Sequence, residues 1–222
     1  MKSYYDRGEF PDLTVTCGSE EFQCHKSVLC SQSKFFQAAC NNGFNETTTS
    51  RVNLGEEDPL LVKIMLDFLY TVGVDVDDDD DEDRSLDDII ALYALGDKYA
   101  IPSLCEYASL DFENTIRDLA DTPQRHSSPD IVLGCIPQLY TSTPDSDRTL
   151  KDLLVEEMIY RHCSSSSARP DVKALLEAME ANAQFQKDMT LSLLKKVKEN
   201  EARTRNEWMS MKSAWDDPPM WK

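Results

Sequence analysis

The residues that come nearest to catalytic chemistry in this sequence are the adjacent Cys24 and His25. A nucleophilic cysteine needs an imidazole within hydrogen-bonding reach to accept its proton. Phe22-Gln23-Cys24 alternates apolar and polar residues and so predicts a strand, in which neighbouring side chains point to opposite faces. The pair is therefore poorly placed for catalysis, and a thiol enzyme using Cys24 stays only as an alternative. The other two histidines, His126 and His162, lack metal-ligand spacing.

An acidic run is the second feature that could do chemistry. Residues 75–88 hold ten acidic residues and one base, Arg84. The net charge of this run, one minus ten or minus 9, is half of the chain's net charge of minus 18. Like charges at this density predict a solvated, extended loop. A weak Ca²⁺ site is the alternative, but Asp77–Asp81 lacks the glycine and the terminal glutamate of an EF-hand loop. We expect no catalytic residue, no metal and no cofactor.

The composition of the whole chain limits the classes of partner that we expect. An excess of 41 acidic over 23 basic residues disfavours direct binding to nucleic acid. No apolar run reaches the length of a membrane span, and the start of the chain has no signal-peptide core. Seven cysteines without CxxC spacing predict reduced, mostly buried thiols. We expect an intracellular protein, cytoplasmic or nuclear, without a membrane partner.

The first half of the chain predicts a hairpin followed by short helices. Residues 13–17 and 22–24 alternate in polarity around a turn at 18–21, and a third short strand is expected at 51–54. A pair of short helices, broken near Ser31-Gln32-Ser33, is expected between them. Asp58-Pro59 predicts the start of another helix, because aspartate caps free N–H groups and proline fits the first turn.

These segments resemble a BTB/POZ domain in their order and in the elements that carry them. The resemblance covers residues 12–118, about half the chain, and the acidic insertion is similar to that of many fungal members. It is carried by these motifs: Pro11-Asp12-Leu13-Thr14-Val15, Phe22 to Leu29, Ser33-Lys34-Phe35-Phe36, Gly43-Phe44-Asn45-Glu46, Val52-Asn53-Leu54, Asp58-Pro59, Phe68-Leu69-Tyr70-Thr71 and Ala94 to Tyr99.

The resemblance implies an α/β (α+β) fold, a small sheet flanked by helical hairpins, that recognises proteins and is not an enzyme. In many family members, residues matching Asp12, His25 and Lys26 form a charged cluster beneath a dimer interface. From the residues alone, a carboxylate and a cation brought together by a hairpin also predict a local ion pair. Only eleven residues precede Asp12, so the N-terminal element that family dimers exchange is expected to be absent.

Phe44-Asn45-Glu46 resembles the apolar-x-acid signature by which some family members bind cullin scaffolds. An exposed ring can fill a pocket while a nearby carboxylate sets the register. The same triplet could instead cap the helical hairpin, with Phe44 packed inward. A cullin-based ubiquitin ligase adaptor is therefore one possible function, although no kelch, MATH or ankyrin module is recognisable downstream.

The second half predicts an all-α region. Helical patterns cover residues 128–140 and 150–159, and a longer one begins after Pro170-Asp171. This last pattern contains a heptad seam with two polar positions, for which packing within the chain is favoured over a self-associating coil. Bases between Lys195 and Arg205 are expected to be solvated, and could attract the acidic loop or an acidic partner. The seam consists of Val172, Leu176, Met179, Ala183, Gln186, Thr190, Leu193 and Val197.

The predicted organisation has three parts: an interaction domain at 1–118, a helical region at 119–207 and a disordered tail at 208–222. The function expected is that of a protein–protein interaction scaffold, binding itself as a homodimer or binding a partner protein. Partner-binding residues would be Phe44, Asn45 and Glu46.

Overall fold

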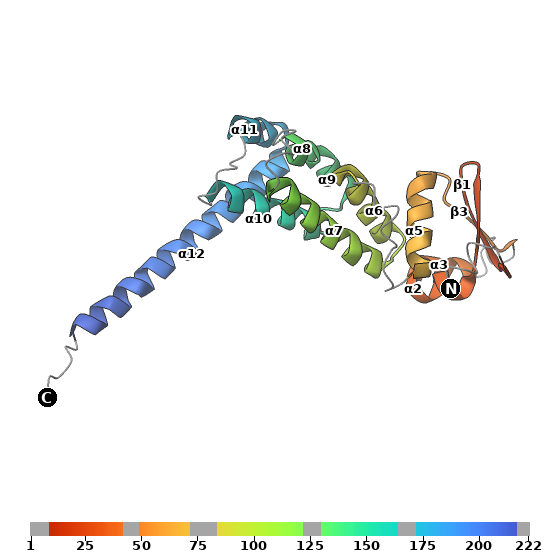
Figure 1. Ribbon diagram of the computed structural model, residues 1–222, viewed down its shortest axis with the longest axis horizontal. Helices are drawn as coiled ribbons and strands as arrows, with labels where there is room; N and C mark the ends of the chain where they lie inside the picture. Colours follow the sequence, from red (N-terminus) through yellow and green to blue (C-terminus); the bar gives the residue numbers. More distant parts are fainter. Residues whose placement is uncertain (1–8, 42–48, 72–83, 122–129, 164–171, 217–222) are drawn as a thin grey trace.

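The computed structural model describes residues 9–41, 49–71, 84–121, 130–163 and 172–216 of the chain. The molecule is elongated (Figure 1). A small sheet with its helices lies at one end, a helical body lies in the middle, and one long helix runs away from the body to the C-terminal end. The described residues contain no helix long and apolar enough to cross a membrane.

The sheet has three strands in the order β2-β1-β3. β1 (Leu13–Cys17) pairs antiparallel with β2 (Glu20–Cys24) and parallel with β3 (Arg51–Asn53). Gly18 turns the hairpin with a φ of +57°, a conformation that glycine adopts without a steric cost. The odd-numbered residues of β1 are buried, as the alternation predicted, so one face of the sheet covers the first core.

The three described helices between residues 26 and 71 share the first core with this sheet. α2 (Lys26–Gln32) and α3 (Lys34–Asn41) are separated by Ser33, whose extended backbone confirms the predicted break. The buried Ser33 hydroxyl donates to the Tyr99 carbonyl at 2.6 Å and accepts from the Phe36 N–H at 3.1 Å. α5 (Pro59–Thr71) begins where predicted, and the Asp58 carboxylate accepts from the Leu60 N–H at 2.7 Å.

α6 (Leu86–Lys98) and α7 (Pro102–Asp121) connect the two hydrophobic cores. Ser85 caps α6, because its side chain accepts from the Asp88 N–H at 3.2 Å. Leu92 and Leu95 lie in the core under the sheet, whereas other buried residues of α6 lie in the core of the helical body. The second core therefore contains residues from both sides of position 118. Residues 75–83 of the acidic run lie outside the described residues.

The helical body is completed by five further helices. They are α8 (Asp130–Gly134), α9 (Ile136–Ser142), α10 (Thr149–Cys163), α11 (Val172–Ala181) and α12 (Ala183–Asp216). The single short helix expected at 128–140 is thus two helices, which meet at Cys135. Residues 122–129 and 164–171, which lie between these helices in the sequence, are outside the described residues.

The long C-terminal pattern departs from its prediction in three ways. The helix is interrupted at Asn182, whose side chain accepts from the Phe185 N–H at 2.9 Å and so starts a new helix. The heptad seam is not the buried face, because Val172, Leu176 and Val197 are exposed while Phe185 and Met189 are buried. Finally, α12 continues to Asp216, so most of the tail expected to be disordered is helical.

Candidate functional site

The three residues of the predicted charged cluster meet where β1, β2 and α2 come together. Hairpin pairing brings Asp12 next to the end of β2, with the Asp12 N–H donating to the Cys24 carbonyl at 3.1 Å. The Asp12 carboxylate then accepts from the backbone N–H of Lys26 at 2.7 Å, in the first turn of α2. A carboxylate in that position satisfies a free helical N–H and interacts favourably with the helix dipole.

The Lys26 ammonium group does not complete the ion pair that the sequence predicted. It donates to the Ser50 hydroxyl at 2.9 Å, just before β3. Among the described residues, the contact between Asp12 and Lys26 is therefore carboxylate to backbone N–H. The lysine side chain instead ties α2 to the segment that leads into β3.

His25 is held in a fixed orientation by two partners. Its Nε2 lies 2.8 Å from the Glu9 carbonyl oxygen, which can only accept, so this nitrogen carries the proton. Nδ1 then accepts from the Tyr70 hydroxyl at 2.9 Å. The same hydroxyl accepts from the His25 backbone N–H at 2.7 Å, and burial raises the pKa of Tyr70. Sequence reasoning missed Tyr70, which lies 45 residues away on α5.

Cys24 is not placed for thiol chemistry. The side chain is fully buried in the first core, while the His25 ring lies on the other side of the chain, against Tyr70 and Glu9. Burial raises the pKa of Cys24 to about 12, the opposite of the lowered pKa that activates a nucleophilic cysteine. Burial also raises the pKa of Cys30 and Cys135 to about 12. The described residues contain no cluster of histidine, cysteine and carboxylate side chains that could hold a metal ion.

The other predicted positions are not described by the structure. Phe44, Asn45 and Glu46 lie outside the described residues, and so does the Asp77–Asp81 segment considered for Ca²⁺. The partner-binding role of the triplet and the Ca²⁺ alternative therefore remain predictions.

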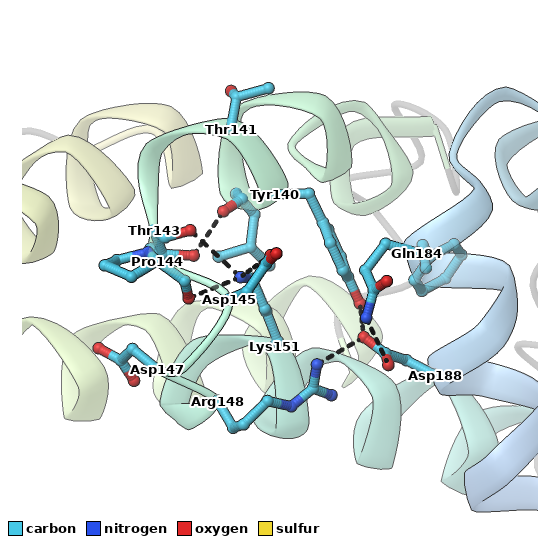
Figure 2. A network of polar contacts seen from close by, with 12 residues as sticks. Tyr140, Thr141, Thr143, Pro144, Asp145, Asp147, Arg148, Lys151, Gln184 and Asp188 are labelled. Atoms are coloured by element: carbon cyan, nitrogen blue, oxygen red, sulfur yellow. Dashed lines mark hydrogen bonds and ion pairs between the residues drawn. The ribbon is translucent and has the colours of Figure 1, made fainter.

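A polar network that the sequence did not predict anchors the beginning of α12 (Figure 2). The Asp188 carboxylate is only 6% exposed. It accepts from the Tyr140 hydroxyl at 2.8 Å and from Arg148 Nη1 at 2.7 Å, so it joins α12 to α9 and to the residue before α10. Arg148 also binds Asp152 at 2.7 Å. Charge-assisted contacts of this kind fix the direction of a helix.

Lys151 lies beside this network and is 1% exposed. Its ammonium group donates to the carbonyl oxygens of Thr143 and Pro144, at 3.2 and 3.0 Å, where α9 ends. It also lies 5.3 Å from the centre of the Tyr140 ring. The partial negative charge of a helix C-terminus and the aromatic face offset the cost of burying this cation.

The distal part of α12 is a second candidate surface. Every described side chain from Val197 to Lys212 is exposed, and this part of the helix has left the body (Figure 1). A shallow groove follows one face of the helix, lined by Val197, Asn200, Glu201, Thr204, Arg205 and Trp208. Trp208 is 55% exposed, which is unusual for a side chain of this size.

Comparisons with known proteins match the N-terminal half. A family model for the BTB/POZ domain matches residues 1–114. Kelch-like protein 25 from Xenopus tropicalis is 35% identical over 63 residues, which are 28% of this chain and 11% of that protein. The solved BTB domain of zebrafish PATZ1 is 22% identical, with a TM-score of 0.40, and the match covers 51% of this chain and 85% of that one.

Proposed function

Because the chain belongs to the BTB/POZ domain family, whose domains mediate protein–protein interaction, we propose that it is a scaffold that binds itself or a partner protein without catalysis. The observation that carries this proposal is the family match over residues 1–114. The described geometry supports it, because the nearest approach to a catalytic pair, Cys24 and His25, has a buried thiol with a raised pKa. The working parts of the domain are then its surfaces.

The first form of the proposal is a homodimer supported by Asp12, His25 and Lys26. These residues lie together at the start of α2, where a hydrogen-bonded carboxylate and a fixed imidazole define a rigid polar base. Asp12 is exposed and His25 and Lys26 are half-buried, so a second copy that covers them would bury them. Polar groups buried in this way favour one geometry over others more than they add stability. A second copy that packs over this base would be held in one orientation.

Sedimentation equilibrium of the full chain tests the homodimer. Asp12→Asn removes a charge but keeps an oxygen that can cap α2, so the fold is retained while dimerisation weakens. Asp58→Asn is the matched control, because it changes the cap of α5 by the same charge. A chain that stays monomeric at high micromolar concentration, or equal weakening by both variants, contradicts the dimer.

The alternative is a substrate adaptor for a cullin-based ubiquitin ligase, with Phe44, Asn45 and Glu46 as the docking residues. The support is the sequence signature together with the similarity to a Kelch-like protein. This relative is matched over only 11% of its length, so its whole-protein role is no more than a guide. The test is capture of a purified cullin N-terminal domain by the parent chain.

Phe44→Ala and Glu46→Ala should each abolish this capture. Phe10→Ala is the control and should not, because it changes a highly exposed phenylalanine outside the triplet. If the parent chain fails to capture the cullin, or both variants capture it equally well, the adaptor role is excluded. Proteins enriched by affinity capture and mass spectrometry would then identify the partner of the scaffold. If the chain neither self-associates nor enriches any protein over bare resin, the scaffold itself is refuted.

A further inference from the structure

The distal half of α12 is a long helix with no covering element among the described residues. Phe185, Asp188 and Met189 attach the helix to the body, and burial ends within two further turns. Residues 197–216 then extend about 30 Å beyond it. An isolated helix of this kind is marginal in water, since most helical stability comes from packing of an apolar face. Its exposed face therefore points to a binding surface.

The exposed face has a strict seven-residue repeat that differs from the seam in the sequence prediction. Leu194, Glu201 and Trp208 are seven residues apart, and so are Val197, Thr204 and Met211. These two series are the a and d positions of a heptad, and the groove beside Trp208 follows them. The four apolar members are all more than half exposed: Leu194, Val197, Trp208 and Met211. A heptad surface fits another helix.

A basic series runs along one edge of this face. Lys198, Arg205 and Lys212 repeat at the same seven-residue interval, at the e positions that flank a helical partner. Lys212 Nζ lies 5.4 Å from the centre of the Trp208 ring, so the edge and the apolar face are continuous. Lys198 and Arg205 make no ion pair with any other residue that the structure describes. This basic edge belongs to a chain whose net charge is minus 18.

The charges distinguish between possible occupants. In a parallel pair of α12 helices, Glu201 would face its own copy in the seam, and in an antiparallel pair the basic edge would face itself. Like charges in contact disfavour both arrangements. A membrane surface is disfavoured too, because Glu201 lies in the middle of the apolar face and would have to enter the lipid.

We propose that the distal half of α12 docks an acidic amphipathic helix of another protein as a heteromeric coiled coil. The carboxylates of that partner lie along Lys198, Arg205 and Lys212, and its apolar residues pack on Val197 and Trp208. A polar or basic partner residue faces Glu201 and sets the register, as single polar seam positions do in coiled coils. This surface is separate from the N-terminal domain, at the opposite end of the molecule (Figure 1), so the inference goes beyond the proposed scaffold.

Two designed peptides test the proposal on the full chain by isothermal titration calorimetry. Both are four heptads long with leucine at a and d and one central asparagine at a, and they carry either glutamate or lysine at every e and g position. We expect the glutamate peptide to bind at least about tenfold more tightly, with an affinity that falls as salt rises. Trp208→Ala should weaken binding by about tenfold or more.

A pair of charge-swapped variants provides the matched control. Lys198→Glu/Arg205→Glu should lose the glutamate peptide and gain the lysine peptide, and an unfolded helix could not produce that gain. Lys196→Glu/Arg203→Glu changes the net charge equally, and these two residues are also seven apart but lie on the far side of α12, so this variant should preserve the preference. Far-UV circular dichroism confirms that the helix is retained in each variant.

Four results overturn the proposal. The first is that neither peptide binds the parent chain, and the second is that both bind equally. The third is tighter binding to phosphatidylcholine–phosphatidylserine vesicles than to the glutamate peptide. The fourth is self-association of the parent chain that Trp208→Ala abolishes, since this would make a second copy the occupant. Loss of homodimerisation through Asp12→Asn leaves the α12 result unaffected, so the two proposals fail separately.

Discussion

Removing the Asp188 carboxylate should destabilise the helical body more than any nearby surface change. Asp188→Ala deletes the acceptor for the Tyr140 hydroxyl and for Arg148, two contacts that attach α12 to α9 and to the residue before α10. The carboxylate is 6% exposed, so little water competes for its hydrogen bonds in the parent fold. The partners left behind determine how large the loss is.

The magnitude follows from those partners. A hydrogen bond to a charged group is worth about 1.5–3 kcal/mol, and a lost partner in a buried ion pair costs about 3–5 kcal/mol. Arg148 keeps its contact with Asp152 and its side chain is 36% exposed, so water and that carboxylate recover part of the loss. The half-buried Tyr140 hydroxyl is less easily hydrated. We therefore expect the free energy of unfolding to fall by about 2–3 kcal/mol.

Urea unfolding followed by far-UV circular dichroism measures this quantity, because the signal reports the helices directly. A double-mutant cycle of Asp188→Ala with Tyr140→Phe and with Arg148→Ala separates the two contacts, and each coupling energy should be about 0.5–2 kcal/mol. Lys187→Ala, an exposed neighbour on the same turn, is the control and should change stability by less than about 0.5 kcal/mol. If Asp188→Ala is as mild as this control, the network does not hold α12 in place.

Three further outcomes follow from the described contacts. Tyr70→Phe leaves a histidine ring nitrogen and a backbone N–H without their partner, so urea unfolding should report a loss of about 1–3 kcal/mol, and an unchanged midpoint would contradict this. Gly96→Ala places a methyl group 2.9 Å from the Cys105 sulfur and should lower the free energy of unfolding by about 1–3 kcal/mol. Gly134→Ala is the control and should not lower it, because the added methyl group meets open space. Equal effects of the two variants would exclude the clash. Burial raises the pKa of Cys24 from 9.0 to about 12, so the stability that the buried neutral thiol contributes is complete below pH 9 and is lost between pH 9 and about 12. Across that window the free energy of unfolding should fall less steeply with pH in Cys24→Ala than in the parent chain. Identical slopes would refute this prediction.

The elements that the sequence predicted well are those set by neighbouring residues. The hairpin around Gly18, the break at Ser33 and the helix start at Asp58 each depend on a few adjacent residues. Turn and capping chemistry acts over three or four positions, so the pattern is visible in the chain itself. The fold class followed from the order of such local segments, and the family match confirmed it.

The C-terminal prediction went wrong where several helical faces were compatible with the sequence. A continuous heptad pattern ran through Asn182, and nothing local distinguished a helix interior from a new cap there. The body covers the face of α12 that contains Phe185 and Met189, because α10 and α9 lie on that side, whereas α11 buries Leu175 and contacts α8 and α12. Periodicity predicts that a helix has an apolar face but not which neighbour will cover it.

The sequence alone determined the local turns and caps, the concentration of acid before α6 and the type of domain formed by the first half. Only the tertiary structure decided that Tyr70 orients His25, that Asp188 meets Tyr140 and Arg148, and that the distal part of α12 is uncovered. These contacts join residues 40 to 48 positions apart. Their partners are selected by the packing of whole helices, and that packing depends on the burial of both cores together and not on any one segment.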